Sequence, residues 1–162
     1  MGMTTVLANM TAPTTITHWE VVGGYEVVQG RFSLAPQLGL GRRGFSIDST
    51  DPSRTPDNVY NYFVLGASAS FAIGPRITLR GSLAFEPVVS GTDAMESEFG
   101  AARRWAVEAG GAIEARPQAH VFVRAAADVQ RFTWSWDMAG PRGAGGATDV
   151  YPSGTLSLGA EY

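Results

Sequence analysis

The sequence contains no cysteine and no lysine, since all 12 of its basic residues are arginine. Without cysteine the chain has no disulfides, no thiolate nucleophile and no cysteine-ligated zinc site. Without lysine it lacks the ammonium group that a P-loop, a Schiff base or a Ser-Lys dyad requires. Several common classes of catalytic mechanism are therefore excluded.

Charge is also sparse, because only 17% of the 162 residues are charged and the net charge is −3. A nucleic-acid-binding protein would carry a basic surface, so we expect no nucleic-acid partner. No apolar run approaches the roughly 18 residues of a transmembrane helix. Residues 1–15 lack the charged start and apolar core of a signal peptide, which predicts either a cytoplasmic chain or a processed or truncated form. The length fits one domain, spanning residues 1–162.

The dominant pattern is an alternation of apolar residues with period two, whereas few windows have helical spacing. A strand places successive side chains on opposite faces, so this alternation predicts two-faced strands. In the stretch 76–89, for example, Ile77, Leu79, Leu83 and Phe85 share one face. Seven such strands are predicted, at 17–28, 31–41, 59–73, 76–89, 104–116, 120–136 and 150–162.

The connections between these strands alternate between short turns, at 29–30, 74–75 and 116–118, and long loops, at 42–58, 90–103 and 137–149. Short turns therefore share one end of the sheet. A further strand must bring the chain to the long-loop end, and we assign it to residues 3–9. The lengths of these turns agree with the positions of the apolar residues. The apolar face changes from odd to even positions across 29–30, which requires an even number of turn residues, and stays odd across 116–118, which requires an odd number. Eight antiparallel strands in this order predict an up-and-down β-barrel, which removes exposed edges.

The polar face of the strands mixes charges with small residues, whereas the apolar face carries no charge over its assigned stretches, such as Val121 to Val129. The interior of an eight-stranded barrel has room only for a compact filling, so we expect the polar face to point inward. The aromatic residues fall toward the two ends of the strands, which is typical of the interfacial girdles of a membrane-spanning barrel. The expected polar lumen network is Glu20, Glu26, Arg80, Glu86, Arg104, Glu108, Arg124, Asp128 and Glu161. The expected interface aromatics are Trp19, Phe63, Phe85, Trp105, Trp134, Trp136, Phe32, Phe71 and Tyr162.

The last ten residues, SGTLSLGAEY, alternate into a C-terminal Tyr162. With this ending, the chain resembles the small OmpA/OmpX-type outer-membrane barrels of the opacity-like porin superfamily. The resemblance implies a porin-like transmembrane protein in the outer membrane of a Gram-negative bacterium, surrounded by the lipid bilayer and lipopolysaccharide. It also implies that the outer-membrane assembly machinery reads the C-terminal strand. Pro36 departs from the pattern, because a mid-strand proline removes a ladder N–H and predicts a bulge or an interruption.

Motifs with catalytic or binding chemistry are weak. The stretch GLGRRG at 39–44 matches G-x-G-x-x-G, but no helix follows it to bind a pyrophosphate. His18 and His120 fall at opposite ends of the predicted barrel, so they cannot share a metal ion. The acidic residues of the long loops lack the spacing of a dedicated calcium site, although they could bridge divalent cations to lipopolysaccharide: Asp48, Asp51, Asp57, Asp93, Glu96 and Glu98. We expect no catalytic residue, metal ion or cofactor.

The predicted three-residue turn at 116–118 places Arg124 diagonal to Glu108, and Arg104 diagonal to Asp128. Because unpaired buried charges are costly, we expect a paired polar network that fills the lumen and leaves no open pore.

The sequence thus predicts an all-β, eight-stranded antiparallel transmembrane β-barrel at the cell surface. It is expected to be a monomeric, non-enzymatic surface or anchoring protein with a plugged lumen and long acidic loops. Two alternatives remain open. One is a soluble lipocalin-like barrel in which Trp19 and Trp105 line a cavity for a small apolar ligand, and the other is an outer-membrane hydrolase acting near His18.

Overall fold

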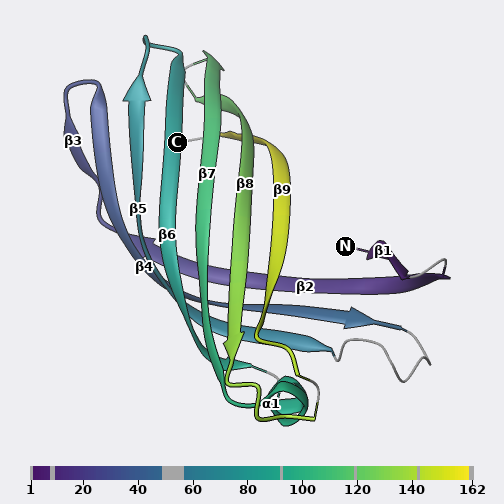
Figure 1. Ribbon diagram of the computed structural model, residues 1–162. Coiled ribbons are helices and arrows are strands. Elements are labelled where there is room, and N and C mark those ends of the chain that lie inside the picture. The colour runs from purple at the N-terminus through teal and green to yellow at the C-terminus, as the bar shows by residue number, and fades with distance from the viewer. Residues whose placement is uncertain are drawn as a thin grey trace.

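The computed structural model describes residues 2–7, 10–48, 57–91, 93–118, 120–141 and 143–160, and most of them belong to one antiparallel β-sheet (Figure 1). Its strands are β1 (Gly2–Leu7), β2 (Met10–Gly24), β3 (Val27–Gln29), β4 (Phe32–Ile47), β5 (Asn58–Ala72), β6 (Ile77–Gly91), β7 (Ala102–Gln118), β8 (Val121–Trp136) and β9 (Gly146–Ala160). A short helix, α1 (Asp93–Phe99), connects β6 to β7. Among the described residues, no helix is long and apolar enough to cross a membrane.

Each long strand pairs with its neighbours in sequence, in the order β1-β2-β4-β5-β6-β7-β8-β9, while β3 follows β2 along the same edge of β4. This order confirms the predicted all-β, antiparallel up-and-down fold. In the described part of the chain, no ladder joins β9 to β1 or β2. The sheet therefore curls into a half-barrel that is open between β2 and β9, in place of the closed barrel that the sequence predicted (Figure 1).

Pro36 explains why the predicted strand 17–28 is divided into β2 and β3. β2 pairs with β4 up to Gly24, and β3 resumes the same register from Val27. The gap lies opposite Pro36, which has no N–H to donate. Its carbonyl accepts a hydrogen bond from the backbone nitrogen of Tyr25 at 3.4 Å. β4 itself runs through Pro36 without a break, so the proline interrupts the partner strand.

The long-loop end contains more regular structure than the sequence predicted. Of the predicted strand 3–9, residues 3–7 lie in β1, which pairs with the start of β2 from Leu7 opposite Met10, and residues 8–9 lie outside the described residues. β4 and β5 continue to pair as far as Phe45 and Asn58, inside the predicted loop 42–58. In these extensions the backbone N–H and C=O groups of one strand bond to those of the other. In an irregular loop the same groups would bond to water.

The register between β7 and β8 differs from the prediction. Gln118 pairs with Val121, so the chain reverses between these two residues, and the predicted turn at 116–118 was wrong. β7 continues through Pro117, where the ladder is irregular between Ala115 and Gln118. Arg124 consequently lies opposite Glu114. The predicted turn would place Arg124 opposite Gly110, and the shift of four positions to Glu114 is even, so each residue stays on the predicted face.

The convex face of the half-barrel carries an uninterrupted apolar surface, which we call the outer apolar belt. It comprises the alternate, outward-facing positions of residues 32–40 (β4), 63–71 (β5), 77–85 (β6), 105–113 (β7), 121–129 (β8) and 150–158 (β9). Every one of these positions is apolar or glycine, and all are exposed or half-buried. We define the belt by these nine-residue segments, and on β6 the apolar surface continues beyond its segment through Pro87 and Val89.

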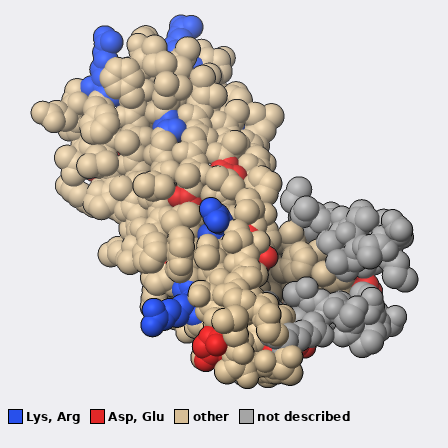
Figure 2. All heavy atoms as spheres, viewed as in Figure 1, with Lys and Arg blue, Asp and Glu red and all other residues tan. Residues whose placement is uncertain are grey.

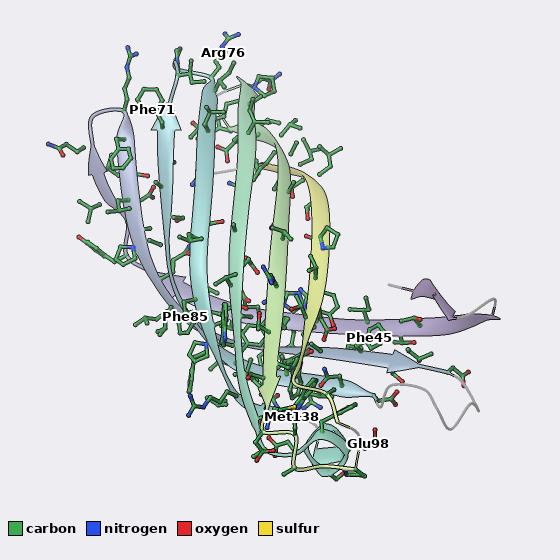
Figure 3. All side chains as sticks on the ribbon, viewed as in Figure 1. Phe45, Phe71, Arg76, Phe85, Glu98 and Met138 are labelled. Carbon is green, nitrogen blue, oxygen red and sulfur yellow. The ribbon has the colours of Figure 1, made fainter. Side chains whose placement is uncertain are left out.

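Polar and charged residues border the outer apolar belt. Beyond its long-loop edge, the next outward positions include Arg42, Asn61, Arg103 and Arg131. Figure 2 shows arginine side chains at the upper end of the molecule, arginine and acidic side chains at the lower end, and between them a surface that is mostly uncharged but includes a few acidic and arginine side chains. In Figure 3, Phe71 lies near the upper end of the strands and Phe85 toward the lower end.

The concave face holds the buried side chains. Tyr60 of β5 stacks on Phe132 of β8, with ring centroids 4.0 Å apart, although two strands separate β5 from β8 in the sheet. Such a contact requires both side chains to point into the concavity. The prediction that Trp134 and Trp136 are interface aromatics was wrong, because they join this buried cluster and are only 2% and 6% exposed. Their even positions place them on the inner face of β8, opposite to Val121 and Val129.

Candidate functional site on the concave face

The predicted lumen residues within the described strands lie on the concave face, but they form separate groups instead of one network. Glu26 is exposed between β2 and β3, where it accepts a hydrogen bond from the hydroxyl of Ser33. Glu161 and the predicted interface residue Tyr162 lie outside the described residues. The remaining predicted aromatics, Trp19, Phe32, Phe63, Phe71, Phe85 and Trp105, are 40–50% exposed on the outer face. The concave groups are centred on Glu114, on three glutamates and on Tyr60.

Glu114 is the centre of the first group, toward the short-turn end. Its side chain is 1% exposed and accepts hydrogen bonds from Arg124 at 2.5 and 3.0 Å. Arg116 donates to its other oxygen at 3.0 Å, and a guanidinium nitrogen of Arg80 lies 3.7 Å away. A single carboxylate therefore offsets part of the positive charge of three arginines. The predicted partner of Arg124 was Glu108, and that pairing was wrong because the β7–β8 register is shifted. A sequence prediction that paired Gln118 with Val121 would have identified Glu114 as the partner.

Arg104 and Arg43 are placed differently from Arg124. Arg104 forms an ion pair with Glu96 of α1 and lies over the ring of Trp134, 5.0 Å from its centroid. The predicted proximity to Asp128 was wrong for the same register reason. Arg43, which the sequence interpretation did not select, is 7% exposed and lies 4.5 Å from the ring centroid of Tyr151.

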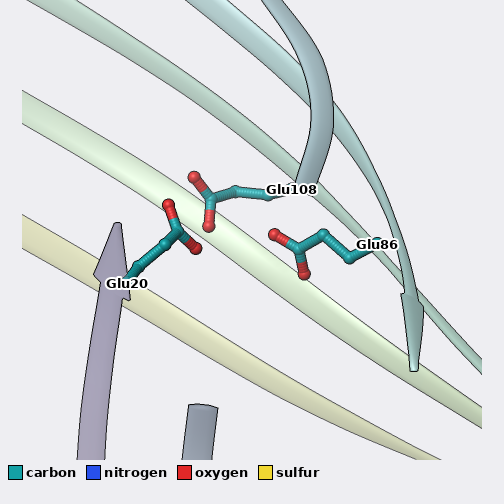
Figure 4. A group of neighbouring side chains, drawn as sticks. All are labelled: Glu20, Glu86 and Glu108. Carbon is teal, nitrogen blue, oxygen red and sulfur yellow. The ribbon is translucent and has the colours of Figure 1, made fainter. Parts of the chain in front are cut away.

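Three glutamates from three strands form the second group. Glu20 of β2, Glu86 of β6 and Glu108 of β7 point toward one another, and one oxygen from each lies within 4.8 Å of the others (Figure 4). Glu86 is fully buried, and its one described side-chain hydrogen bond comes from the amide nitrogen of Gln130 at 2.6 Å. Carboxylates are ligands suited to hard divalent cations. Arg43 is close enough to interact electrostatically with all three glutamates.

Tyr62 connects this acidic group to His18. Its hydroxyl lies 2.9 Å from Nε2 of His18 and donates to Glu20 at 3.2 Å. Gly41 makes room for the tyrosine ring, because a Cβ at that position would lie 2.6 Å from the ring carbon Cζ. A residue without a side chain is therefore needed where the ring crosses β4.

Tyr60 is the centre of the third group, at the long-loop end. Its hydroxyl accepts hydrogen bonds from Nε1 of Trp134 at 2.7 Å and from the amide nitrogen of Asn58 at 2.5 Å, and it donates to Asp149. Tyr60 lies three positions beyond the outer apolar belt on β5, and burial raises its pKa, so the hydroxyl stays protonated. The group joins β5, β8 and β9 across the concavity.

A cavity of about 540 Å³ opens between β2 and β9, lined by His18, Glu20, Arg43, Glu108, Asp128 and residues 150–153 of β9 together with Ile16 and Phe45. Ser153 and His18 share this cavity, as a hydrolase would require. However, Ser153 donates to Asp128 at 2.7 Å, whereas His18 contacts Tyr62. The described hydrogen bonds therefore keep the serine and the histidine in separate pairs.

The other predicted candidates do not come together in the described part of the chain. His120 lies at the β7–β8 turn, at the opposite end from His18. Of the loop carboxylates, Asp57 accepts a hydrogen bond from the backbone of Ile47 and Glu96 pairs with Arg104, while Asp51 lies outside the described residues.

No protein-family model matches the chain, and neither the curated proteins nor the solved structures contain a significant match.

Proposed function

We propose that this protein is an integral outer-membrane β-barrel protein of a Gram-negative bacterium, of the small OmpA/OmpX type, that acts as a non-enzymatic surface or anchoring protein. The observation that carries the proposal is the outer apolar belt. Its nine residues extend roughly 30 Å along each strand at about 3.3 Å per residue. With a strand tilt of about 40°, this corresponds to a height of roughly 23 Å, close to the apolar band of about 25 Å in outer-membrane barrels.

The distribution of exposed apolar side chains supports the same proposal. In the described part of the chain, 27 large hydrophobic residues are exposed, whereas only eight hydrophobic residues are buried. A water-soluble protein buries such residues because transfer from water is favourable. Lipid acyl chains would cover the belt without this penalty.

The concave face argues against the lipocalin-like alternative. That alternative needs Trp19 and Trp105 to line an apolar cavity, but they are 50% and 40% exposed on the convex face. The concave face instead contains charged groups, including Glu86 and Glu114, which are 0% and 1% exposed. A small apolar ligand in the cavity between β2 and β9 would have to desolvate Glu20, Arg43, Glu108 and Asp128, which line it.

Within this proposal, the lumen is plugged by the Glu114 group, the three glutamates and the Tyr60 group. The bilayer and lipopolysaccharide surround a monomer, and the assembly machinery reads the C-terminal strand. The long-loop end carries the extensions of β2, β4 and β5, which would project from the membrane as the surface available for contacts (Figure 1). Neither a cofactor nor a catalytic residue is required.

Tryptophan quenching by brominated lipid tests the proposal. Single-tryptophan variants that retain Trp19, Trp105 or Trp134, with the other tryptophans replaced by phenylalanine, are folded into vesicles of brominated phosphatidylcholine. We expect strong quenching of Trp19 and Trp105 relative to non-brominated vesicles. Trp134 serves as the internal control, because it is 2% exposed on the concave side. Equal and weak quenching at all three positions would contradict membrane insertion.

A further inference from the structure

Glu20, Glu86 and Glu108 connect the open side of the half-barrel with the middle of the sheet (Figure 4). Glu86 of β6 and Glu108 of β7 are diagonal neighbours, because Glu108 lies opposite Ala84. Glu20 reaches them from β2, which β4 and β5 separate from β6 in the sheet. One carboxylate oxygen of each residue lies within 4.8 Å of the other two. The group therefore spans the concavity and does not follow from strand pairing.

The three carboxylates have little positive charge close to them. In the described part of the chain, no arginine forms an ion pair with any of the three. Arg43 acts on them beyond ion-pair distance, while its guanidinium lies over the ring of Tyr151. His18 lies 4.0 Å from Glu20 and is charged only when it is protonated. Neighbouring carboxylates repel one another when all are ionised, so the group must take up protons or a cation.

Two fully buried oxygen atoms favour the cation. Gln130 of β8 lies opposite Glu108 and points into the group, since its amide nitrogen donates to one oxygen of Glu86 at 2.6 Å. Gln130 and Glu86 are both 0% exposed. Within the described chain, the carbonyl oxygen of Gln130 and the second oxygen of Glu86 both lack a hydrogen-bond donor, which is costly for buried atoms. One proton could serve only one of these oxygens, whereas a cation can contact both.

The ligands and their spacing fit calcium. The three glutamates and Gln130 all offer oxygen, the ligand atom of hard cations. Three oxygens within 4.8 Å of one another share a centre no more than about 2.8 Å from each, close to the Ca–O distance of about 2.3–2.6 Å. Magnesium requires a shorter distance of about 2.0–2.1 Å. We propose that Glu20, Glu86 and Glu108 bind a calcium ion on the concave face, with the carbonyl oxygen of Gln130 as a further ligand.

The cavity between β2 and β9 provides a route for the ion. Glu20 and Glu108 line this cavity of about 540 Å³, together with Arg43 and Asp128. Arg43 offsets part of the negative charge of the glutamates, and the remainder is suited to a divalent cation. Bound there, calcium links β2 to β6 and β7. The ion therefore stabilises the curl of the half-barrel on its open side, where the described strands form no ladder.

The calcium site goes beyond the proposed function, because its geometry is the same whether lipid or water covers the outer apolar belt. It also departs from the expectation, based on the sequence, that the protein binds no metal ion. Binding is therefore tested in detergent. A failure of membrane insertion, measured by the quenching of Trp19 and Trp105, would leave the calcium site intact.

Terbium(III) is the probe, because it prefers oxygen ligands as calcium does and luminesces when a nearby aromatic ring transfers energy to it. Tyr62 is next to the site, since its hydroxyl donates to Glu20. The protein is folded in detergent, freed of metal ions with EDTA, transferred to EDTA-free buffer and titrated with terbium. We expect saturable emission that calcium displaces at a lower concentration than magnesium does.

Glu86→Gln and Glu108→Gln keep the shape of the side chain and remove one charged ligand. Each should weaken terbium binding at least about tenfold, because affinity depends on the number of charged ligands. Gln130→Leu removes the neutral oxygen and should weaken binding less than the loss of a carboxylate. Glu26→Gln is the matched control, because it makes the same change at an exposed residue between β2 and β3 and should leave the affinity unchanged.

Urea midpoints in detergent show whether the variants fold and whether the ion stabilises the sheet. In EDTA, Glu86→Gln should be at least as stable as the unchanged chain, because it removes one of three clustered negative charges. Calcium should raise the midpoints of the unchanged chain and of Glu26→Gln. It should leave the midpoint of Glu86→Gln where it was in EDTA.

Three results would overturn the calcium site. One is the absence of saturable terbium emission together with a urea midpoint that calcium leaves unchanged, which would mean that the group holds protons instead. Another is equal terbium affinity of the unchanged chain, Glu86→Gln and Glu108→Gln, which would place the ion elsewhere in the protein. The third is displacement of terbium by magnesium at the same concentration as by calcium, which would contradict the selection by size.

Discussion

The indole nitrogen of Trp134 donates a hydrogen bond of 2.7 Å to the hydroxyl of Tyr60, across a separation of 74 residues. β8 and β5 do not pair, so this bond links two distant parts of the sheet. The same hydroxyl donates to Asp149 of β9. The curvature of the sheet at the long-loop end is therefore held by side chains as well as by ladders.

Trp134→Phe and Tyr60→Phe are expected to lower the free energy of unfolding by about 1–3 kcal/mol each. Tyr60→Phe leaves the buried indole N–H of Trp134 without its partner, and Trp134→Phe removes one of the hydrogen bonds to the Tyr60 hydroxyl. The double variant should cost less than the sum of the two single variants. Urea unfolding in detergent, followed by heat-modifiable gel migration, measures these changes without relying on tryptophan fluorescence.

Trp136→Phe is the matched control for that series. Trp136 is similarly buried, but its indole nitrogen has no hydrogen-bond partner in the described part of the chain. Its substitution should therefore cost less than Trp134→Phe. Equal losses for the two tryptophans, with additive effects of Trp134→Phe and Tyr60→Phe, would mean that ring volume and not the hydrogen bond is responsible.

Parity made the faces of the strands predictable from the sequence. The positions of Phe63, Leu65 and Phe71, for example, determine one face of β5 whatever the register with its neighbours. The registers between strands were harder to predict, because Pro117 suggested a turn at 116–118, whereas in the structure the chain reverses between Gln118 and Val121. This uncertainty changed the partner of Arg124 from Glu108 to Glu114.

Contacts across the concavity could not be predicted from period-two patterns. Tyr60 and Trp134 meet because the sheet curls, and the curl depends on the twist of every strand between them. The three glutamates come from β2, β6 and β7, and their convergence depends on the same curvature. The prediction of Trp134 and Trp136 as interface residues used their position along the strand and overlooked their parity.

The same chemical change should have different effects at two buried glutamates. Glu114→Gln removes the negative charge that three arginines share, so we expect a loss on the order of 2 kcal/mol, between the values for surface and fully buried ion pairs. Glu86→Gln removes one of three clustered negative charges, so we expect no loss or a gain of up to about 1 kcal/mol. The amide of Gln130 can rotate to accept a hydrogen bond from the new glutamine. Urea midpoints in detergent provide the comparison.

The double variant Glu114→Gln, Arg124→Gln serves as the control, because it removes one positive charge along with the carboxylate. It should recover part of the stability lost in Glu114→Gln. Comparable losses for Glu86→Gln and Glu114→Gln would contradict the two different charge environments.

Gly41→Ala tests the close approach of β4 and the Tyr62 ring. The added Cβ would lie 2.6 Å from Cζ of Tyr62, so the ring must move away from His18 and Glu20. We expect a loss of about 1–3 kcal/mol from overpacking. Gly81→Ala is the control, since its nearest neighbour would be a backbone oxygen at 4.0 Å. If the ring causes the loss, Gly41→Ala should cost less when it is combined with Tyr62→Leu. An equal loss in both backgrounds would mean that the alanine strains the backbone and does not collide with the Tyr62 ring.

The depth dependence of an outward-facing arginine distinguishes a lipid-facing belt from an exposed surface in water. Ala125 lies at the centre of the belt on β8, whereas Ser135 lies beyond its long-loop edge on the same face of the same strand. At a bilayer midplane, arginine costs about 2–4 kcal/mol, and near the interface the cost falls to about 0–1 kcal/mol. Ala125→Arg should therefore destabilise the protein in vesicles far more than Ser135→Arg. In water both side chains would be solvated, so equal and small effects of the two substitutions on the urea midpoint in vesicles would contradict a lipid-facing belt.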